Sequence, residues 1–364
     1  MKVLSVVGAR PQFVKLAPVA SALNARGVEH YIVHTGQHYE PALSDIFFEE
    51  LGIPRPDVHL AVGSGGHGEQ TGAMLGRLET VILGQRPDWV LIYGDTNSTL
   101  AAAVAAVKIH APLAHLEAGL RSFNRRMPEE HNRVLSDHAA DLCLAPTEAA
   151  MTQLAREGLA ERSVLVGDVM TDVLMRVRDR VAGSPPRIPD GVTGPFRIAT
   201  IHRAENTDDP ARLREIVLAL QSLPEPTVLF VHPRLRARAA EHGVTLAAGS
   251  LHVVDPVGYP DLIGTALHSI GIVTDSGGLQ KEAFLLRVPC TTIRTETEWT
   301  ETVDLGWNIL VPDPAQGRLL AAVSRPAPPA TDDTPYGSGD ASERTVDALL
   351  RRVTPPAWPH EASG

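Results

Sequence analysis

Short apolar runs that alternate with longer helical patterns are the feature that most restricts the fold of this chain. In its first half, helical patterns separate apolar runs at 2–7, 29–34, 89–93, 113–116 and 142–145. Continuous apolar runs that are separated by helices are typical of parallel strands whose sheet is covered on both faces. The pattern therefore predicts an α/β fold with a doubly wound parallel sheet.

The alternation stops near the middle of the chain and then restarts. Residues 183–195 are rich in proline and glycine, as interdomain linkers often are. Apolar runs then recur at 197–201, 227–231, 251–254 and 270–274. We therefore predict two Rossmann-like domains, 1–182 and 183–340, with a deep cleft between them, and 364 residues suit about two domains. A last helix at 341–352 and a disordered tail at 355–364 complete the prediction.

Charge and cysteine content exclude several classes of protein. The chain has 33 basic and 43 acidic residues, a net charge of −10, so nucleic acid and anionic membranes would repel it unless it had a local basic patch. Its two cysteines, Cys143 and Cys290, cannot build a disulfide framework, and because the sequence has no CxxC or paired Cys/His ligand set, a structural zinc site is not expected. The first residues do not resemble a signal peptide. We expect a soluble, cytoplasmic protein that binds neither nucleic acid nor membranes.

Candidate functional residues are those that follow the predicted strands, because ligands of open α/β sheets bind at the carboxyl ends of strands. The first run is followed by GARPQF, in which Arg10 lies at the start of a predicted helix. An arginine beside the positive end of a helix suits a phosphate. The alternative is an arginine on a surface turn, with Pro11 beginning the helix.

Carboxylates follow two neighbouring strands. Glu117 comes directly after one predicted strand and Asp95 comes two residues after another, which favours a carboxylate cluster. Such a cluster suits proton transfer, because closely spaced carboxylates differ in how strongly they hold a proton. The alternative for Asp95 is a role in a helix cap. Pro128, Glu129 and Glu130 are typical of a helix start, which accounts for at least one of these glutamates.

Two histidines follow strands of the second domain. His202 comes after the run at 197–201, and His232 comes after the run at 227–231. A single histidine is more often structural than catalytic, and the chain has 15 of them. Two at equivalent positions favour a functional role.

The run at 270–274 is followed by a glycine-rich helix start. Ser276, Gly277 and Gly278 would let backbone amides approach a pyrophosphate at the helix N-terminus. Glu282 lies about a turn and a half into the same helix, where it could accept hydrogen bonds from ribose hydroxyls. The alternative is a glycine-rich helix entry that binds nothing.

Together these motifs resemble the family of non-hydrolysing UDP-N-acetylglucosamine 2-epimerases. The resemblance covers nearly the whole chain, through GARPQFVKLAP, GDTNSTLA, HLEAGLRS, MPEEHNR, HRAEN, DSGGLQKEA and PYGSGDASERTVDAL. It implies a glycosyltransferase-B fold in which the helix at 341–352 returns to the first domain. It also implies inversion at C2 of a UDP-sugar, with elimination of UDP to a 2-acetamidoglucal and re-addition. The product from UDP-N-acetylglucosamine would be UDP-N-acetylmannosamine, no cofactor or metal is needed, and a homodimer is expected.

The resemblance also implies roles for individual residues. Asp95, Glu117 and Glu129 resemble the acid/base carboxylates of the family, and His202 resembles its catalytic-region histidine. The residues that resemble its substrate-binding groups are Arg10, Lys15, Arg133, His232, Ser276, Gly277, Gly278 and Glu282.

Several segments depart from the common bacterial pattern. GQHYE at 36–40 and GSGGHGEQ at 63–70 lack the arginines of a second, activating substrate site, so activation by substrate is not expected. RTETEWTETVDLGWN at 294–308 also differs from that pattern. These features are similar to a branch that includes epimerases of UDP-2,3-diacetamido-2,3-dideoxyglucuronate, which is the alternative substrate. A glycosyltransferase of the same fold is the further alternative.

Overall fold

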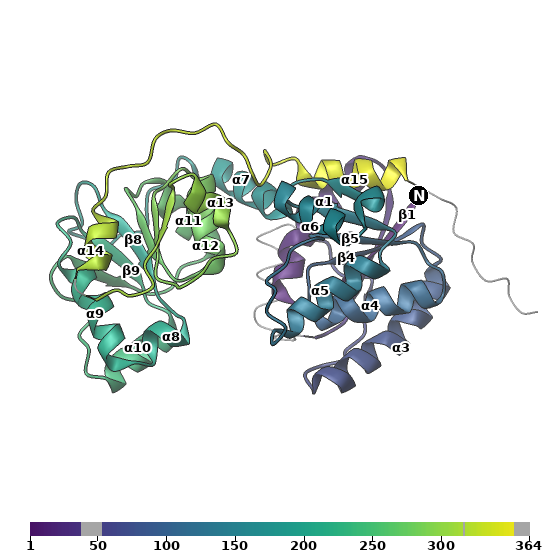
Figure 1. The fold of residues 1–364 in the computed structure, drawn as a ribbon, viewed down its shortest axis with the longest axis horizontal. Helices are drawn as coiled ribbons and strands as arrows, with labels where there is room; N and C mark the ends of the chain where they lie inside the picture. The colour runs from purple at the N-terminus through teal and green to yellow at the C-terminus, as the bar shows by residue number, and fades with distance from the viewer. Residues whose placement is uncertain (38–52, 316, 353–364) are drawn as a thin grey trace, which may run out of the picture. The chain divides into compact units, whose positions relative to one another are not determined.

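The computed structural model describes residues 1–37, 53–315 and 317–352 and contains two compact units. Unit 1 comprises Met1–Val173 and Thr334–Gly364, and unit 2 comprises Leu174–Asp333 (Figure 1). The division falls within helix α7 (Val169–Val181), whereas the sequence placed the domain boundary after residue 182. The predicted tail at 355–364 and residues 38–40 of GQHYE lie outside the described residues.

The sheet of unit 1 is parallel throughout, with the strand order β3-β2-β1-β4-β5-β6-β7. Its strands are β1 (Lys2–Val7), β2 (Glu29–His34), β3 (Val58–His59), β4 (Trp89–Tyr93), β5 (Leu113–Leu116), β6 (Leu142–Ala145) and β7 (Ser163–Leu165). The order reverses between β1 and β4, and such a switch point is where open α/β sheets bind ligands.

Helices cover both faces of this sheet because alternate residues of each strand point to opposite sides. On β1, Val3 and Val7 belong to one hydrophobic core, while Leu4 and Val6 belong to the other. The helices of unit 1 are α1 (Arg10–Ala25), α3 (His67–Gln85), α4 (Asn97–Lys108), α5 (Pro128–Ala139), α6 (Glu148–Arg156), the short η1 (Ala160–Arg162) and α15 (Ala341–Arg351).

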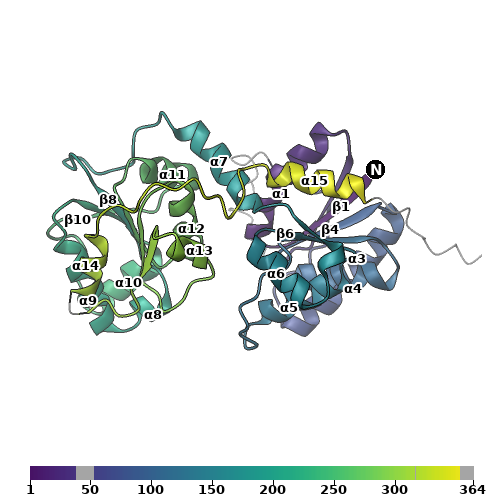
Figure 2. The same cartoon turned by 45° about the horizontal axis from the view of Figure 1, so that its top comes forward.

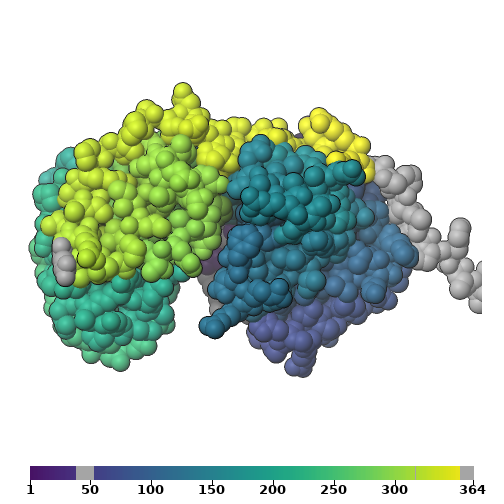
Figure 3. All heavy atoms as spheres, viewed as in Figure 1, coloured from purple at the N-terminus to yellow at the C-terminus, as the bar shows by residue number. Residues whose placement is uncertain are grey.

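The last helix, α15, is part of unit 1. It packs against α1, as Figures 1 and 2 both show. The carboxylate of Asp172 accepts hydrogen bonds from the amides of Ala341 and Ser342 at 3.0 and 2.7 Å, which anchors the start of α15. Near its other end, the indole Nε1 of Trp89 donates to the carbonyl of Leu349 at 3.2 Å. In Figure 3 this segment, in yellow, lies on the surface of unit 1.

Unit 2 repeats the same winding with the strand order β10-β9-β8-β11-β12-β13. Its strands are β8 (Arg197–Thr200), β9 (Thr227–Phe230), β10 (Leu251–Val254), β11 (Ile272–Thr274), β12 (Cys290–Thr292) and β13 (Asn308–Leu310). Its helices are α8 (Ala204–Thr207), α9 (Pro210–Gln221), α10 (Pro233–Glu241), α11 (Tyr259–Leu267), α12 (Gly277–Leu285), α13 (Thr300–Asp304) and α14 (Arg318–Val323). The switch point lies between β8 and β11.

Two doubly wound parallel sheets confirm the predicted α/β class. The sequence did not predict β3, β7, β12 and β13, which have only two or three residues each. Across the part of the chain that is described, no helix combines the length and apolarity needed to cross a membrane.

Candidate active site

At the switch point of unit 1, Lys15 and Glu117 form an ion pair. Lys15 lies on α1, and Glu117 directly follows β5. Glu117 has φ = 74°, a left-handed backbone conformation that residues other than glycine adopt rarely. A Cβ added to Gly94 would lie 3.4 Å from the Glu117 carboxylate and 3.5 Å from Lys15 Nζ. The turn that carries Asp95 therefore packs against this ion pair.

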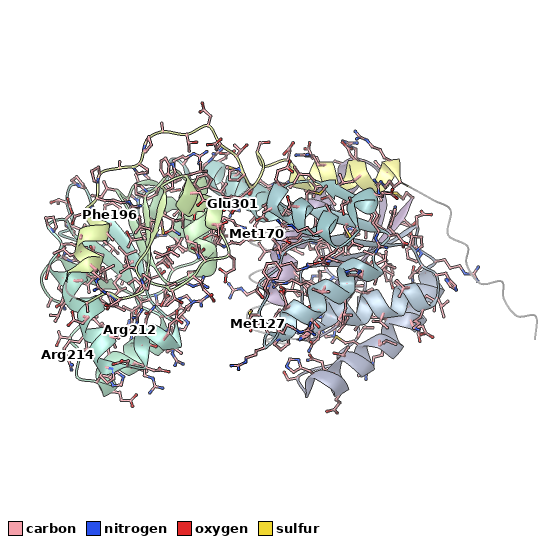
Figure 4. The ribbon with its side chains drawn as sticks, viewed as in Figure 1. Met127, Met170, Phe196, Arg212, Arg214 and Glu301 are labelled. Carbon is pink, nitrogen blue, oxygen red and sulfur yellow. The ribbon has the colours of Figure 1, made fainter. Side chains whose placement is uncertain are left out.

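The charge of Lys15 is maintained by its neighbours. Burial alone would lower the pKa of its ammonium group. The carboxylates of Glu117, Asp168 and Asp95 outweigh this effect, so the net pKa lies above that of an ordinary lysine. Asp168 is a buried residue that the sequence analysis missed, because it lies beyond β7, a strand too short to be predicted. Its carboxylate accepts a hydrogen bond from the amide of Met170 at 2.8 Å, at the start of α7 (Figure 4).

Asp95 is held by two neighbouring residues of α5. Arg133 donates a hydrogen bond from Nη2 to the Asp95 carboxylate. Asn132 donates from its side-chain amide to the main-chain carbonyl of Asp95 at 2.9 Å. The Asp95 side chain remains 33% exposed. A carboxylate that is oriented on one side and open on the other can exchange a proton with a ligand.

The two adjacent glutamates of α5 have different environments. Glu130 is buried, and its carboxylate accepts three hydrogen bonds of 2.9 Å, from the amide and hydroxyl of Ser122 and the amide of Phe123. Burial alone would raise the pKa of Glu130. These hydrogen bonds and the charge of Arg133 lower it by more, so the net pKa is below the ordinary value. Glu130 therefore holds the loop that precedes α5.

Glu129 is exposed in the first turn of α5, just after Met127 and Pro128. Figure 4 labels Met127, the residue before this helix. Among the described residues, none forms a hydrogen bond or an ion pair with the Glu129 carboxylate. Unit 1 thus brings together Lys15, Asp95, Glu117 and Arg133, but it does not bring the Glu129 carboxylate into contact with them.

Arg10 is exposed at the first position of α1, where the helix is fixed by Gln12. The buried Gln12 amide accepts hydrogen bonds from Gly8 and Ala9 at 2.8 and 3.0 Å and donates to the carbonyl of Tyr93 at 2.8 Å. A side chain on Gly8 would clash with the hydroxyls of Thr35 and Ser98. The start of α1 is therefore tightly packed beside the end of β4, and Arg10 projects from a rigid turn.

In unit 2, the start of α12 lies beside two guanidinium groups. Ser276 caps this helix by accepting a hydrogen bond from the amide of Leu279 at 3.4 Å. A Cβ on Gly277 would lie 3.7 Å from Arg294 Nη1 and 4.0 Å from Arg203 Nη2. Gly278 is exposed, and nothing lies within 4 Å of its Cβ position among the described residues. Backbone amides at a helix start together with two arginines are suited to a diphosphate.

The sequence analysis missed both of these arginines. Arg203 belongs to the HRAEN motif that was noted for His202, whereas Arg294 follows β12, which was not predicted. Arg294 is buried and forms a bidentate ion pair with Glu298, both distances being 2.9 Å. Burial alone would lower the pKa of Arg294. The hydrogen bonds and charge of Glu298 raise it by more, so the net pKa is above the ordinary value. The guanidinium group therefore stays charged and in place.

His202 and His232 lie close together, with ring centroids 5.7 Å apart. His202 Nδ1 is 3.0 Å from the fully buried carboxylate of Asp275, so this nitrogen donates. His232 Nδ1 accepts from the amide of Arg234 at 3.2 Å, so its hydrogen is on Nε2. The two rings come from the ends of neighbouring strands, β8 and β9, as the sequence predicted.

Asp275 fixes the loop that carries His202. Its carboxylate accepts hydrogen bonds from the amides of His202 and Arg203 and from the side chain of Asn206, at 2.9 to 3.1 Å. Burial raises the pKa of Asp275, but these bonds lower it more, and the net pKa is below the ordinary value. Asn206 is oriented in turn by Arg212 of α9, labelled in Figure 4, at 2.8 Å.

Glu282 lies farther along α12 and is partly exposed. The hydroxyl of Tyr259 donates to its carboxylate at 2.9 Å. Burial and the charge of Glu282 both raise the pKa of Tyr259, which therefore remains a donor at neutral pH. The described residues hold no group of three or more histidine, cysteine or acidic side chains placed to bind a metal ion.

Comparison with known proteins places this chain in a family. The family model for UDP-N-acetylglucosamine 2-epimerase matches residues 21–350. The UDP-2,3-diacetamido-2,3-dideoxy-D-glucuronate 2-epimerase of Pseudomonas aeruginosa is 46% identical over 361 residues, which cover 96% of this chain and 100% of that protein.

Two solved structures cover 96% of this chain and 100% of their own chains. The Methanocaldococcus jannaschii UDP-GlcNAc 2-epimerase in complex with UDP-GlcNAc and UDP has a TM-score of 0.78 and 37% identity. The UDP-GlcNAc 2-epimerase of Neisseria meningitidis bound to UDP-GlcNAc has a TM-score of 0.79 and 27% identity. These neighbours are of the glycosyltransferase-B type, which confirms the predicted fold class. The chain therefore belongs to the UDP-N-acetylglucosamine 2-epimerase family.

Proposed function

We propose that this protein inverts C2 of a UDP-2-acetamido sugar by eliminating UDP and adding it back. The observation that carries the proposal is the pairing of two carboxylates with cations at adjacent strand ends, Glu117 with Lys15 and Asp95 with Arg133. A glycosyltransferase of the same fold transfers the sugar to an acceptor and needs at most a base to deprotonate it, rather than a set of acid/base groups around C2. The paired carboxylates therefore favour the epimerase.

The chemistry explains why such pairs are needed. The C2 proton of the sugar has no adjacent carbonyl group, so direct deprotonation is difficult. When the bond between C1 and the UDP oxygen breaks, UDP leaves with the electron pair. Loss of the C2 proton to a base then forms the C1=C2 double bond of the glycal. Re-addition of UDP at C1 and of a proton to the opposite face of C2 gives the epimer.

Protonation on the opposite face requires acid/base groups on both sides of C2. In our proposal Asp95 and Glu117 are two of these groups, and Glu129, exposed in the first turn of α5, is the third. Lys15 and Arg133 stabilise the charged forms of the two paired carboxylates, and Arg10 contacts the substrate at the start of α1. General acid/base catalysis of this kind contributes about 10²–10⁴ in rate for each group.

We assign the UDP leaving group to unit 2. The amides at Ser276, Gly277 and Gly278 and the guanidinium groups of Arg203 and Arg294 would hold the diphosphate. His202 and His232 would lie beside it, and Glu282 would accept hydrogen bonds from the ribose. Donors aimed at the charge that develops on a leaving group contribute about 10²–10³ each.

Two substrates are candidates. UDP-N-acetylglucosamine is the first, because the family model and the solved neighbours carry that name. UDP-2,3-diacetamido-2,3-dideoxyglucuronate is the second, and it is favoured by the 46% identity to an epimerase of that sugar. By comparison, sequence alignment over 362 residues gives 39% identity to the M. jannaschii UDP-N-acetylglucosamine 2-epimerase, whose structural alignment gives 37%.

The test is incubation with each UDP-sugar in D₂O, followed by NMR of the products. We expect deuterium at C2 and formation of the C2 epimer from one of the two substrates. If neither sugar exchanges its C2 hydrogen, the epimerase proposal is wrong, and transfer of the sugar to an added acceptor would support the glycosyltransferase. Sedimentation of the purified protein and fractionation of cells test the predicted homodimer and cytoplasmic location.

A further inference from the structure

His115 and Asp137 form a buried pair beneath the turns that carry Asp95 and Glu117. Both side chains have no exposed surface. His115 Nδ1 is 2.6 Å from Asp137 Oδ1, and His115 Nε2 is 2.7 Å from the carbonyl oxygen of Gly94, the residue before Asp95. The other Asp137 oxygen accepts a hydrogen bond of 3.0 Å from the amide of Gly119, two residues after Glu117. The pair thus bridges the ends of β4 and β5.

Both ring nitrogens of His115 face acceptors. The carboxylate of Asp137 and the carbonyl oxygen of Gly94 are both acceptors, so the ring of His115 is held from its two sides. Asp137 also has a cationic partner, because Arg121 Nη1 lies 2.7 Å from Asp137 Oδ2, and Arg121 forms two further 2.7 Å bonds with Glu157. A buried ion pair of this kind is weak evidence for stability, but it can hold one geometry.

This bridge has no direct access to a ligand, because it is fully buried. Its hydrogen bonds to Gly94 and Gly119 nevertheless hold the two turns that carry the proposed acid/base groups. The backbone of Glu117 is in the left-handed region, at φ = 74°, and a residue other than glycine persists there only when its surroundings hold it. Gly94 is also left-handed, at φ = 61°, which glycine adopts without strain. A displacement of about 1 Å at reacting groups can cost about 10²-fold in rate.

We propose that the His115–Asp137 pair is a positioning device that sets the separation of the Asp95 and Glu117 carboxylates. This inference rests on the epimerase function proposed above. His115 acts through the Gly94 carbonyl, and Asp137 acts through the Gly119 amide. Neither residue contacts the substrate.

Two substitutions of His115 break different halves of the bridge. The amide of His115→Asn reaches the place of Nδ1 and keeps the bond to Asp137, but it loses the bond to Gly94. The amide of His115→Gln reaches the place of Nε2 and keeps the bond to Gly94. We expect kcat to fall about 100-fold in H115N and less in H115Q, with KM and the Kd for UDP within about twofold of wild type.

The matched control is Glu157→Gln. It removes the ion pair between Glu157 and Arg121, the residue that also pairs with Asp137, and it leaves the contacts with Gly94 and Gly119 unchanged. We expect E157Q to lower Tm but to leave kcat within twofold of wild type. Asp137→Glu serves as a further variant if neither histidine variant folds, because it keeps the charge and lengthens the side chain. Its kcat should fall at least tenfold.

Hydrogen exchange gives a readout that does not depend on activity. The Gly94 amide, which donates to Leu116 at 3.1 Å, should exchange faster in H115N than in wild type or E157Q. Unchanged kcat in both histidine variants, or a loss of kcat no greater than that of E157Q, would overturn the positioning role. If instead the wild-type protein does not exchange the C2 hydrogen of any UDP-sugar with solvent, the proposed function fails. The exchange rate of the Gly94 backbone amide would still show whether His115 holds this turn.

Discussion

Units 1 and 2 have sheets with the same winding, but the polar groups at their switch points differ in kind. In unit 1 they are side chains that can transfer protons, and each carboxylate has a cationic partner: Lys15 for Glu117, and for Asp95 the guanidinium of Arg133, which also pairs with Glu130. In unit 2 they are backbone amides at the start of α12 beside Arg203 and Arg294, which do not lose protons at neutral pH, together with the histidines His202 and His232. Under the proposed function, the same scaffold supports proton chemistry in one unit and anion binding in the other.

This difference predicts that substitutions in unit 1 reduce turnover, whereas substitutions in unit 2 reduce nucleotide binding. The largest effect is expected for Glu117→Gln, which keeps the shape of the side chain but cannot accept a proton. We expect kcat to fall by about 10²–10⁴ and the Kd for UDP to stay within twofold. Steady-state kinetics and calorimetry measure the two quantities, and Glu148→Gln on the exposed start of α6 is the control. A Kd that rises as much as kcat falls would break the comparison.

The next largest effect is expected for Glu129, and it should differ in kind from the effect of substituting the adjacent Glu130. Glu129→Gln should lower kcat about 10²-fold without changing Tm, because Glu129 is exposed and its carboxylate has no hydrogen bond or ion pair within residues 1–37, 53–315 and 317–352. Glu130→Gln should lower Tm, because Glu130 accepts three hydrogen bonds from the loop before α5. Wild-type kcat in E129Q would remove Glu129 from the acid/base set.

Arg203→Gln tests the second half of the comparison. Removal of one charged donor beside α12 should raise the Kd for UDP by between about tenfold and 100-fold, with a smaller change in kcat. Titration calorimetry with UDP measures the change. Arg214→Gln is the control, since Arg214 lies exposed on α9 (Figure 4) and only approaches the carbonyl of His242 at 3.5 Å. Equal Kd values for R203Q and R214Q would contradict the assignment of the diphosphate to α12.

The smallest effect concerns the stability of unit 2. Asp275→Asn should lower the unfolding free energy of this unit by about 1.5–2 kcal/mol at pH 7, because it removes charged hydrogen bonds. The pKa of Asp275 is lowered in the folded state, so its contribution is present above the unfolded pKa of about 3.9 and is lost as pH falls through the folded pKa. The wild-type advantage should therefore shrink at acidic pH.

Urea titration with hydrogen exchange of unit 2 peptides measures this difference at each pH. The control is Asp209→Asn at the start of α9, where asparagine caps a helix about as well as aspartate. A D275N deficit that stays constant between pH 7 and pH 3 would show that the charge of Asp275 is not its source.

The length of each strand and the range of each contact determine which features of the two units could be predicted from the sequence. Buried strands such as β1 and β4 are continuous apolar runs, so both sheets and the residues after their longer strands were found. The strands β7 and β12 have three residues each, too few to carry a periodic signal, and Asp168 and Arg294 beyond them were missed. Motifs in unit 2 act largely through the local backbone, which is why DSGG predicted the start of α12.

The ion pairs and hydrogen bonds at the unit 1 site instead join residues that are far apart in the sequence and meet only when the chain folds. Lys15 and Glu117 are 102 residues apart, so nothing in the local sequence indicates their contact. Glu129 and Glu130 are equivalent as residues of a helix start, and only the path of the loop at Ser122 and Phe123 determines which one is buried. The His115–Asp137 bridge was missed for the same reason.

In the proposed reaction, UDP detaches from the sugar and is held by unit 2 while unit 1 exchanges the C2 proton. The direct test uses a UDP-sugar with ¹⁸O in the oxygen that bridges C1 and the β-phosphate. During the reaction, a detached β-phosphate can rotate before UDP adds back. We predict that ¹⁸O appears in the non-bridging positions of the recovered UDP-sugar, at a rate comparable with C2 deuterium exchange. Deuterium exchange with the label still wholly in the bridge would contradict the account.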